Sequence, residues 1–256
     1  MTLVNDTNPA LKTFGGLERC SRYAFGPNRL HYCGPDANRE LKELIEESGD
    51  DFGLAHLLRQ FKTLFPYLRR IAEANNIADS FDARVVEAYW LGNELLDNVR
   101  KDTLYDFLTQ GLKVKDKMKN KEFSSLEEKI GAGALPHHSF HVLNVWSQSG
   151  HADKLEDIER IGECIISSGK VTQVSGSEIT VATEPLICQN GKLSLGSMVS
   201  KKITRQLECE YDSEQIKPGQ IVSIHWSVPC EVITPRQAAK LRACTLRSLR
   251  LANLNL

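Results

Sequence analysis

The sequence has no long hydrophobic run and no excess of charge of either sign. None of its apolar stretches approaches the roughly 20 residues that a membrane-spanning helix requires. Its opening segment, Met-Thr-Leu-Val-Asn-Asp, lacks the basic and the apolar parts of a secretory signal. The formal net charge is -1 with both signs interspersed, so no field attracts nucleic acid or an anionic membrane. We therefore expect a cytoplasmic, soluble protein with neither nucleic acid nor a membrane among its partners.

Closely spaced cysteine pairs are also missing. The 7 cysteines include no Cys-x-x-Cys motif, and their number is odd. Disulfide frameworks need paired cysteines, and structural zinc sites use ligands at short spacing. The sequence argues against both, and we expect free thiols in a reducing compartment.

The hydrophobic pattern changes near residue 160 of the 256 residues. Before that point apolar residues recur at helical spacing, most clearly over 82–98. After it, short strands alternate with turns at 175–177 and 217–220, and a capping box at 234–237 opens a final helix. The sequence predicts an α+β protein with a helical domain over 1–160 and a small β-domain with a C-terminal helix over 161–256.

Two motifs of the β-domain occur in a fixed order. Cys164 stands ahead of Gly-Lys-Val at 169–171, and a Pro-Gly turn at 218–219 leads into an apolar strand that ends in His225. With these motifs, the segment from 164 to about 245 resembles the HypC/HupF family of nickel–iron hydrogenase maturation chaperones. The resemblance implies a HypC-like, OB-like β-barrel, in which Cys164 and His225 match the cysteine and the histidine of the family.

The resemblance also implies a cargo and partners. In the HypC/HupF family the cysteine thiolate carries an iron centre with cyanide and carbon monoxide ligands. The carrier passes this iron between a maturation scaffold protein and the precursor of the hydrogenase large subunit. The same iron cofactor and the same two partners are therefore implied here, with Cys164 and His225 as the iron-binding residues.

The N-terminal part carries a second resemblance. Its elements Arg-Tyr-Ala at 22–24, Tyr-Cys-Gly-Pro at 32–35 and Pro-His-His at 136–138 are similar to those of an uncharacterised group of prokaryotic helical proteins. This second resemblance implies no mechanism.

The strand that ends in His225 predicts where that side chain points. Val222, Ile224 and Trp226 alternate with Ser223 and His225, so the apolar side chains are expected to fill the barrel while His225 points away. A thiolate binds iron strongly, and a neighbouring imidazole would lower its pKa and keep it ionised. The alternative is a buried linker cysteine and a surface histidine with no joint role.

A histidine cluster in the helical domain is the second candidate site. If a helix begins at Pro136, His137 and His141 lie at i and i+4, where two imidazoles can share a metal. His138 takes the place of the glutamate of a His-Glu-x-x-His peptidase, which disfavours that activity. Glu87 on the segment 82–98 is a further candidate ligand. Capping, interdomain hydrogen bonds and a solvated glutamate are the alternative interpretation.

The loop that contains His31 and Cys33 is the third candidate. It leads directly into a predicted helix N-terminus, whose free N–H groups can bind an anion or lower the pKa of the Cys33 thiol. A rigid turn that starts the helix explains the same residues, and we prefer that interpretation.

These patterns favour an accessory protein of nickel–iron hydrogenase maturation that binds or transfers an iron-containing precursor through the Cys164 thiolate. The main alternative is an enzyme dependent on iron or another metal, with its site in the helical domain. Such an enzyme would supply a diatomic ligand, and the barrel would serve as a docking module. A third alternative is an adaptor without metal. It is consistent with an internal Cys164, which has no free α-amino group, and with Ser168 at the proline position of the family.

Overall fold

The computed structural model describes residues 14–46, 51–151, 155–205 and 216–255. Helices precede the strands, as predicted, and the α+β class is confirmed. The α-helices before the strands are α1 (Gly16–Arg29), α2 (Asn38–Glu46), α3 (Asp51–Arg59), α4 (Leu64–Ala74), α5 (Ala83–Trp90), α6 (Lys101–Asp106), α7 (Asn120–Gly131), α8 (His138–Phe140) and α9 (Leu155–Cys164). The 3₁₀-helical segments are η1 (Glu94–Asn98), η3 (Val114–Asp116) and η5 (Asn253–Asn255). The π-helical segments are η2 (Phe107–Gly111) and η4 (His141–His151).

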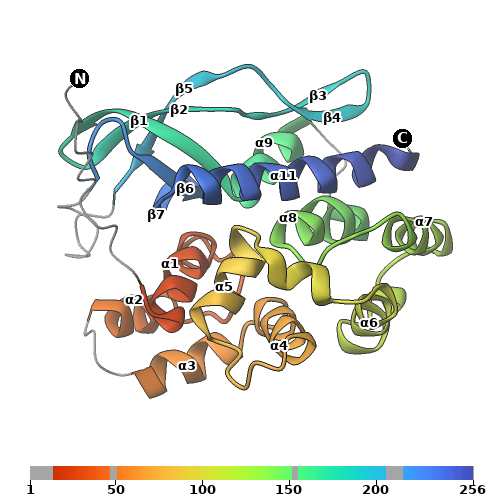
Figure 1. The fold of residues 1–256 in the computed structure, drawn as a ribbon. Helices are drawn as coiled ribbons and strands as arrows, with labels where there is room; N and C mark the ends of the chain where they lie inside the picture. The colour runs from red at the N-terminus through yellow and green to blue at the C-terminus, as the bar shows by residue number, and fades with distance from the viewer. Residues whose placement is uncertain (1–13, 47–50, 152–154, 206–215, 256) are drawn as a thin grey trace, which may run out of the picture.

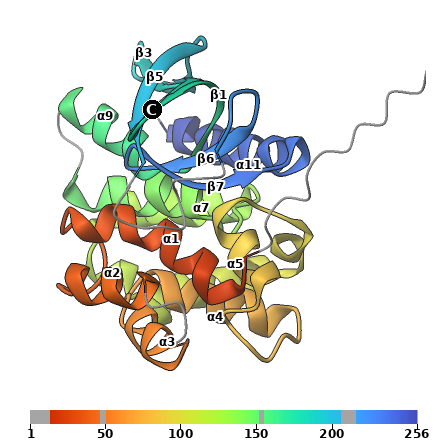
Figure 2. The same ribbon diagram turned by 90° about the vertical axis from the view of Figure 1, so that its left-hand side faces the viewer.

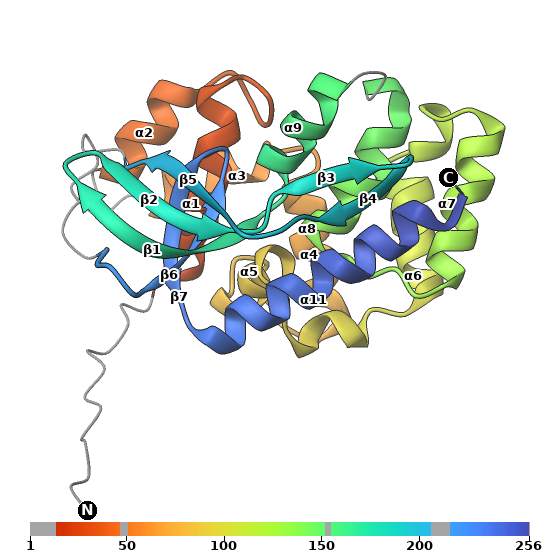
Figure 3. The same cartoon turned by 90° about the horizontal axis from the view of Figure 1, so that it is seen from above.

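The strands form one antiparallel sheet and a separate hairpin. The sheet has the order β5-β2-β1-β6-β7, and β3 pairs only with β4. The strands are β1 (Ser167–Ser175), β2 (Glu178–Thr183), β3 (Leu186–Gln189), β4 (Lys192–Leu195), β5 (Val199–Thr204), β6 (Ile221–His225) and β7 (Val228–Ile233). The prediction of a closed barrel is wrong for the described strands, because no ladder joins β5 to β7. The chain between β2 and β5 instead leaves the sheet as the β3–β4 hairpin, which packs on α9 and α11 (Figure 3).

The terminal helix α11 (Pro235–Ala252) lies between the sheet and the helical layer (Figure 1). Its predicted capping box is present: Thr234 Oγ1 accepts from Gln237 N at 3.1 Å, and the Gln237 side chain accepts from Thr234 N at 2.9 Å. Leu241 and Leu251 belong to the same buried cluster as the side chains of α1, α4 and α5. Residues from both sides of position 160 therefore share a core, while the division into two domains stays a prediction. No helix in the described ranges combines the length and apolarity of a membrane crossing.

The alternation predicted for β6 holds up to its last residue. Val222 and Ile224 are buried in the core of the sheet, and Ser223 and His225 face α1. Trp226 does not join that core. It lies with Ser227 in the turn between β6 and β7, where both have positive φ values of 51° and 57°. Such a two-residue hairpin turn ends the alternation, so the prediction for Trp226 is wrong.

Helix α1 is joined to the sheet by a buried polar network, which places α1 directly under β6 and β7 (Figure 2). Arg19 donates to the Glu231 carboxylate at 3.2 Å, and the Tyr23 hydroxyl donates to the same carboxylate at 2.9 Å. The Tyr23 hydroxyl also lies 2.8 Å from Ser223 Oγ. Because these groups are buried, their mutual satisfaction fixes α1 on the sheet.

Candidate functional site

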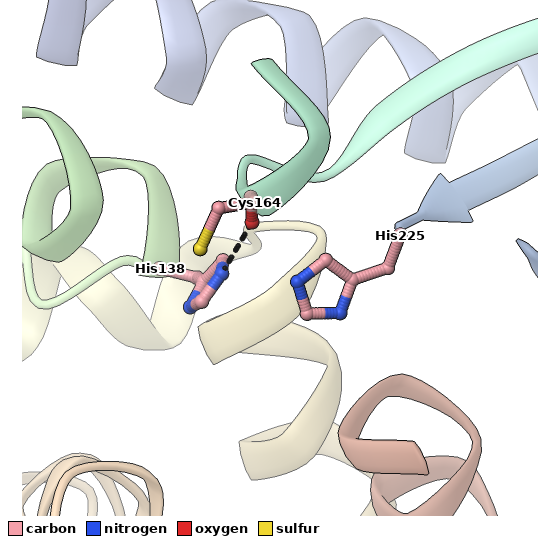
Figure 4. Close-up of side chains that lie close together, drawn as sticks. All are labelled: His138, Cys164 and His225. Carbon is pink, nitrogen blue, oxygen red and sulfur yellow. Dashed lines mark hydrogen bonds between the residues drawn. The ribbon is translucent and has the colours of Figure 1, made fainter. Parts of the chain in front are cut away.

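A cavity of about 130 Å³ lies between the helical layer and the sheet. Five of the residues selected from the sequence line it, namely Cys33, His138, His141, Cys164 and His225. Within the described residues, His138, Cys164 and His225 form the one group of potential metal ligands whose ligand atoms all lie within 4.8 Å of one another. Figure 4 shows these three side chains, hereafter the ligand cluster, converging from the start of α8, the end of α9 and the end of β6.

The β1–β6 ladder explains why Cys164 and His225 meet. Ser167 pairs with Ile224 in this antiparallel ladder, so the chain just before β1 lies beside the end of β6. The backbone contact continues beyond the ladder, because Trp226 N donates to Glu163 O at 2.9 Å. The pairing of Cys164 with His225 that the resemblance implied is thus present in the fold.

His225 is held in the orientation of a metal-binding histidine. It is 1% exposed, and its Nδ1 lies 2.7 Å from the Tyr23 carbonyl oxygen. A carbonyl only accepts, so Nδ1 carries the proton and Nε2 keeps its lone pair. Nε2 is buried and makes no hydrogen bond of good geometry within the described residues, although the Cys164 carbonyl is near enough to the ring to affect its pKa. Metal-binding histidines commonly donate their other N–H to a carbonyl in this way, so His225 fits a metal ligand.

Burial also keeps both histidines of the ligand cluster neutral at pH 7. Desolvation lowers the pKa of His225 to about 4, although the carbonyls of Tyr23 and Cys164 oppose this shift. The pKa of His138 is lowered by burial first and then by its neighbour His225. Neutral imidazole is the form that binds metal. Neither imidazole therefore has to lose a proton before it can bind a metal ion.

His138 is fixed by two hydrogen bonds. Nε2 donates to the Cys164 carbonyl at 2.9 Å, which leaves the Nδ1 lone pair to accept from the Tyr89 hydroxyl at 3.2 Å. The sequence had indicated His138 as a ligand of the helical domain but not its position beside Cys164. That position depends on the hydrogen bond between His138 at the start of α8 and the carbonyl at the end of α9, 26 residues away, for which the sequence carries no local signal.

Replacement of Tyr89 by phenylalanine is expected to tighten metal binding. The hydroxyl competes for the Nδ1 lone pair of His138, and a hydrogen bond of this kind contributes ~0.5–1.5 kcal/mol. Its removal should therefore lower the dissociation constant for Co²⁺ by up to about tenfold, since ~1.4 kcal/mol corresponds to a factor of ten. Titration of Tyr89→Phe and wild-type protein with Co²⁺ measures the change. Weaker binding by the variant would contradict Nδ1 as the ligand atom.

The thiol of Cys164 does not have the low pKa expected from a neighbouring imidazole. Burial raises the pKa to about 12, the nearby Cys33 thiol adds to the rise, and a hydrogen bond involving Trp226 opposes it. The expectation is wrong because the two imidazoles are neutral and supply no positive charge. A bound metal ion would supply that charge, and its binding would displace the thiol proton.

His137 and His141 have different surroundings. His137 Nδ1 accepts from Ser139 N at 3.1 Å, so His137 caps α8 and does not line the cavity. His141 lines the cavity, and its Nδ1 lies 3.2 Å from the Tyr67 hydroxyl. His137 is the N-cap residue of α8 and His141 follows the helix, so only His141 is placed at the cavity, and a metal shared by this i and i+4 pair stays a prediction. For His137, capping is the alternative interpretation that the sequence had allowed.

Glu87 also has a structural role. Its Oε2 lies 3.2 Å from Arg19 Nη1 and accepts from Gln237 Nε2 at 2.8 Å. It is not part of the ligand cluster. The prediction of Glu87 as a metal ligand is corrected accordingly, because an arginine and an amide already satisfy its carboxylate.

The two candidate residues in the loop after α1, His31 and Cys33, lie in different surroundings. His31 is exposed, and its Nδ1 lies 3.0 Å from an Asp36 carboxylate oxygen, away from the ligand cluster. Cys33 is exposed as a residue, but it lines the cavity, and loss of solvent raises the pKa of its thiol. A lowering of this pKa by a helix N-terminus, the interpretation that we did not prefer over a rigid turn, is not present, because desolvation is the largest effect and raises the pKa.

The fold and site define an α+β protein with two histidines and a cysteine gathered between a helical layer and an antiparallel sheet. The chain belongs to the family described as "Family of unknown function (DUF6390)", whose model matches residues 12–256. This match covers the helical part and the sheet together. No curated protein and no solved structure matches the sequence.

Proposed function

We propose that the protein binds a transition-metal ion through Cys164, His225 and His138, and that it carries iron for the maturation of a nickel–iron hydrogenase. The observation that carries the proposal is the ligand cluster, whose ligand atoms lie within 4.8 Å of one another, together with the buried Nε2 of His225, which makes no hydrogen bond within the described residues. A buried polar atom without a partner is costly. A metal ion at this point removes that cost, and imidazole with thiolate is a donor set suited to iron, cobalt and zinc.

The carrier role is supported by the order of motifs in the sequence together with the juxtaposition of Cys164 and His225. In this proposal the cargo is an iron fragment with cyanide and carbon monoxide ligands, bound by the thiolate. A maturation scaffold protein delivers it in the cytoplasm, and the hydrogenase large-subunit precursor receives it. The protein's own residues hold the cargo and release it, with no turnover of the small ligands.

The test is iron quantification with infrared spectroscopy on anaerobically purified protein, comparing wild type with Cys164→Ala. We expect stoichiometric iron and the absorption bands of metal-bound cyanide and carbon monoxide in the wild type, and loss of both in the variant. Cys188→Ala is the matched control, because Cys188 is a free, exposed cysteine outside the cavity. Iron and bands that persist in Cys164→Ala would overturn the proposal.

A metal-dependent enzyme is the second candidate function. Three protein ligands leave one coordination position for water or substrate, as in catalytic zinc sites, and the cavity of about 130 Å³ has room for a small molecule. Metal without the infrared bands would favour the enzyme over the carrier. Metal-free wild-type protein after anaerobic purification would contradict both and favour an adaptor.

A further inference from the structure

The loop between α1 and α2 lines the cavity with Tyr32 and Cys33, and a ring stack, two hydrogen bonds and a close approach hold it there. The Tyr32 ring stacks on Trp226 with centroids 4.3 Å apart and an interplanar angle of 14°. Asn28 Nδ2 donates to the carbonyls of Cys33 and Pro35 at 2.9 and 2.8 Å. Gly34 has φ 88°, and a Cβ atom at Gly34 would lie 2.3 Å from the Phe61 ring. The backbone of Cys33 therefore has a defined position beside the cavity.

The ligand cluster lacks one donor for tetrahedral coordination. Structural sites for zinc and similar ions use four protein ligands, commonly two cysteines and two histidines. Cys33 lines the same cavity, and its thiol is near enough to Cys164 to affect it electrostatically. The unpartnered Nε2 of His225 independently marks the cavity as a ligand site, because His225 is 1% exposed.

His141 is the competing fourth donor in the cavity, and its surroundings are less favourable. The Tyr67 hydroxyl lies against its Nδ1 just as the Tyr89 hydroxyl does in His138, so the difference is Lys117. This lysine lines a neighbouring cavity together with His141, and its positive charge is near enough to act on the ring. A second cation beside His141 would be repelled by that lysine. A thiol has the further advantage that it becomes an anion when it binds metal, which adds charge attraction to the bond.

We infer that Cys33 is the fourth ligand of the metal site and that, as an exposed cysteine lining the cavity, it captures the incoming metal. This inference rests on the metal site of the proposed function and applies to a bare divalent ion, because cyanide and carbon monoxide on iron would take up coordination positions of their own. Cys33 lies outside the group whose ligand atoms are within 4.8 Å, so its side chain swings inward when the metal binds. Two metal–sulfur bonds form and the two thiol protons pass to solvent, with no change of oxidation state. A ligand on an exposed loop suits a carrier, because its release opens the site.

The experiment is a titration of metal-free wild-type, Cys33→Ser and Cys164→Ala protein with Co²⁺ under anaerobic conditions. The thiolate-to-cobalt charge-transfer band grows with the number of bound thiolates. We expect Cys33→Ser to bind Co²⁺ with half the wild-type band intensity at saturation. His141→Ala and Cys188→Ser are expected to keep the full intensity. Thermal unfolding of each variant, followed by circular dichroism, establishes that it is folded.

The outcomes separate this inference from the proposed function. Full charge-transfer intensity in folded Cys33→Ser would overturn the role of Cys33 while leaving the site of Cys164 intact. An altered cobalt spectrum in His141→Ala with an unaltered one in Cys33→Ser would assign the fourth position to His141. A charge-transfer band that survives in Cys164→Ala at wild-type intensity would instead overturn the proposed function.

Discussion

Replacement of His225 by alanine is expected to lower the metal affinity of the protein by more than about 100-fold. Loss of an outer partner of a metal ligand already costs ~10–100-fold, and loss of the ligand itself costs more. His225 is prearranged for binding, because the Tyr23 carbonyl fixes its tautomer and leaves Nε2 free and buried. Competition between the protein and a chelator for Co²⁺ measures the affinity of His225→Ala against wild type.

His137→Asn is the matched control for this experiment. Asparagine is a good N-cap residue, so this variant keeps a side-chain acceptor at the start of α8 while it removes an imidazole. We expect its metal affinity to equal that of wild type. Unchanged affinity in His225→Ala together with lost affinity in His137→Asn would place the metal at the histidine pair that the sequence spacing had indicated.

The contrast between these histidines shows which parts of the site the sequence can predict. Cys164 precedes β1 and His225 ends β6, two strands that pair directly, and it was the family resemblance carried by the ordered motifs that had implied a joint role for the two residues. The spacing of His137 and His141 predicted a shared face only for a helix that begins at Pro136. The helix begins at His138 instead, and this shift of two positions turns a possible ligand into a cap. A cap residue and a first-turn residue are difficult to distinguish from sequence, because either can be polar.

Contacts between segments that are distant in the chain could not be predicted from the sequence. The Tyr23 carbonyl that orients His225 is 202 residues away in the chain, and no periodicity links the two. The open sheet is a similar case. Alternation in β6 predicted which side chains face the sheet core, but it does not specify whether the outer strands pair with one another. The β3–β4 hairpin depends on packing against α9 and α11, which only the folded chain supplies.

Replacement of Glu231 by alanine is expected to destabilise the protein by about 3 kcal/mol, at the lower end of the ~3–5 kcal/mol for breaking a buried ion pair. The side chains of Arg19 and Glu231 are only 9% and 2% exposed, and removal of the carboxylate also leaves the Tyr23 hydroxyl without that acceptor. The remaining contact of Arg19 with Glu87 limits the loss. Urea unfolding of variant and wild type measures the difference.

Glu184→Ala is the matched control, because Glu184 pairs with Arg242 at a more exposed position, with side chains 28% and 51% exposed. Exposed pairs contribute ~0–1 kcal/mol, so this variant is expected to unfold close to the wild-type urea concentration. Equal destabilisation by Glu184→Ala and Glu231→Ala would contradict a special role for the buried pair. Near-wild-type stability of Glu231→Ala would also contradict a stabilising role for the buried pair.

The stability and the metal affinity of this protein are expected to be linked through α1. The helix carries both Arg19, which binds Glu231, and Tyr23, whose carbonyl orients His225. A metal that binds only the folded chain stabilises it by mass action. Saturating Co²⁺ should therefore raise the urea midpoint of Glu231→Ala, which keeps all the proposed ligands, and should leave the midpoint of His225→Ala nearly unchanged. The same Co²⁺-induced rise in both variants would show that the metal binds elsewhere.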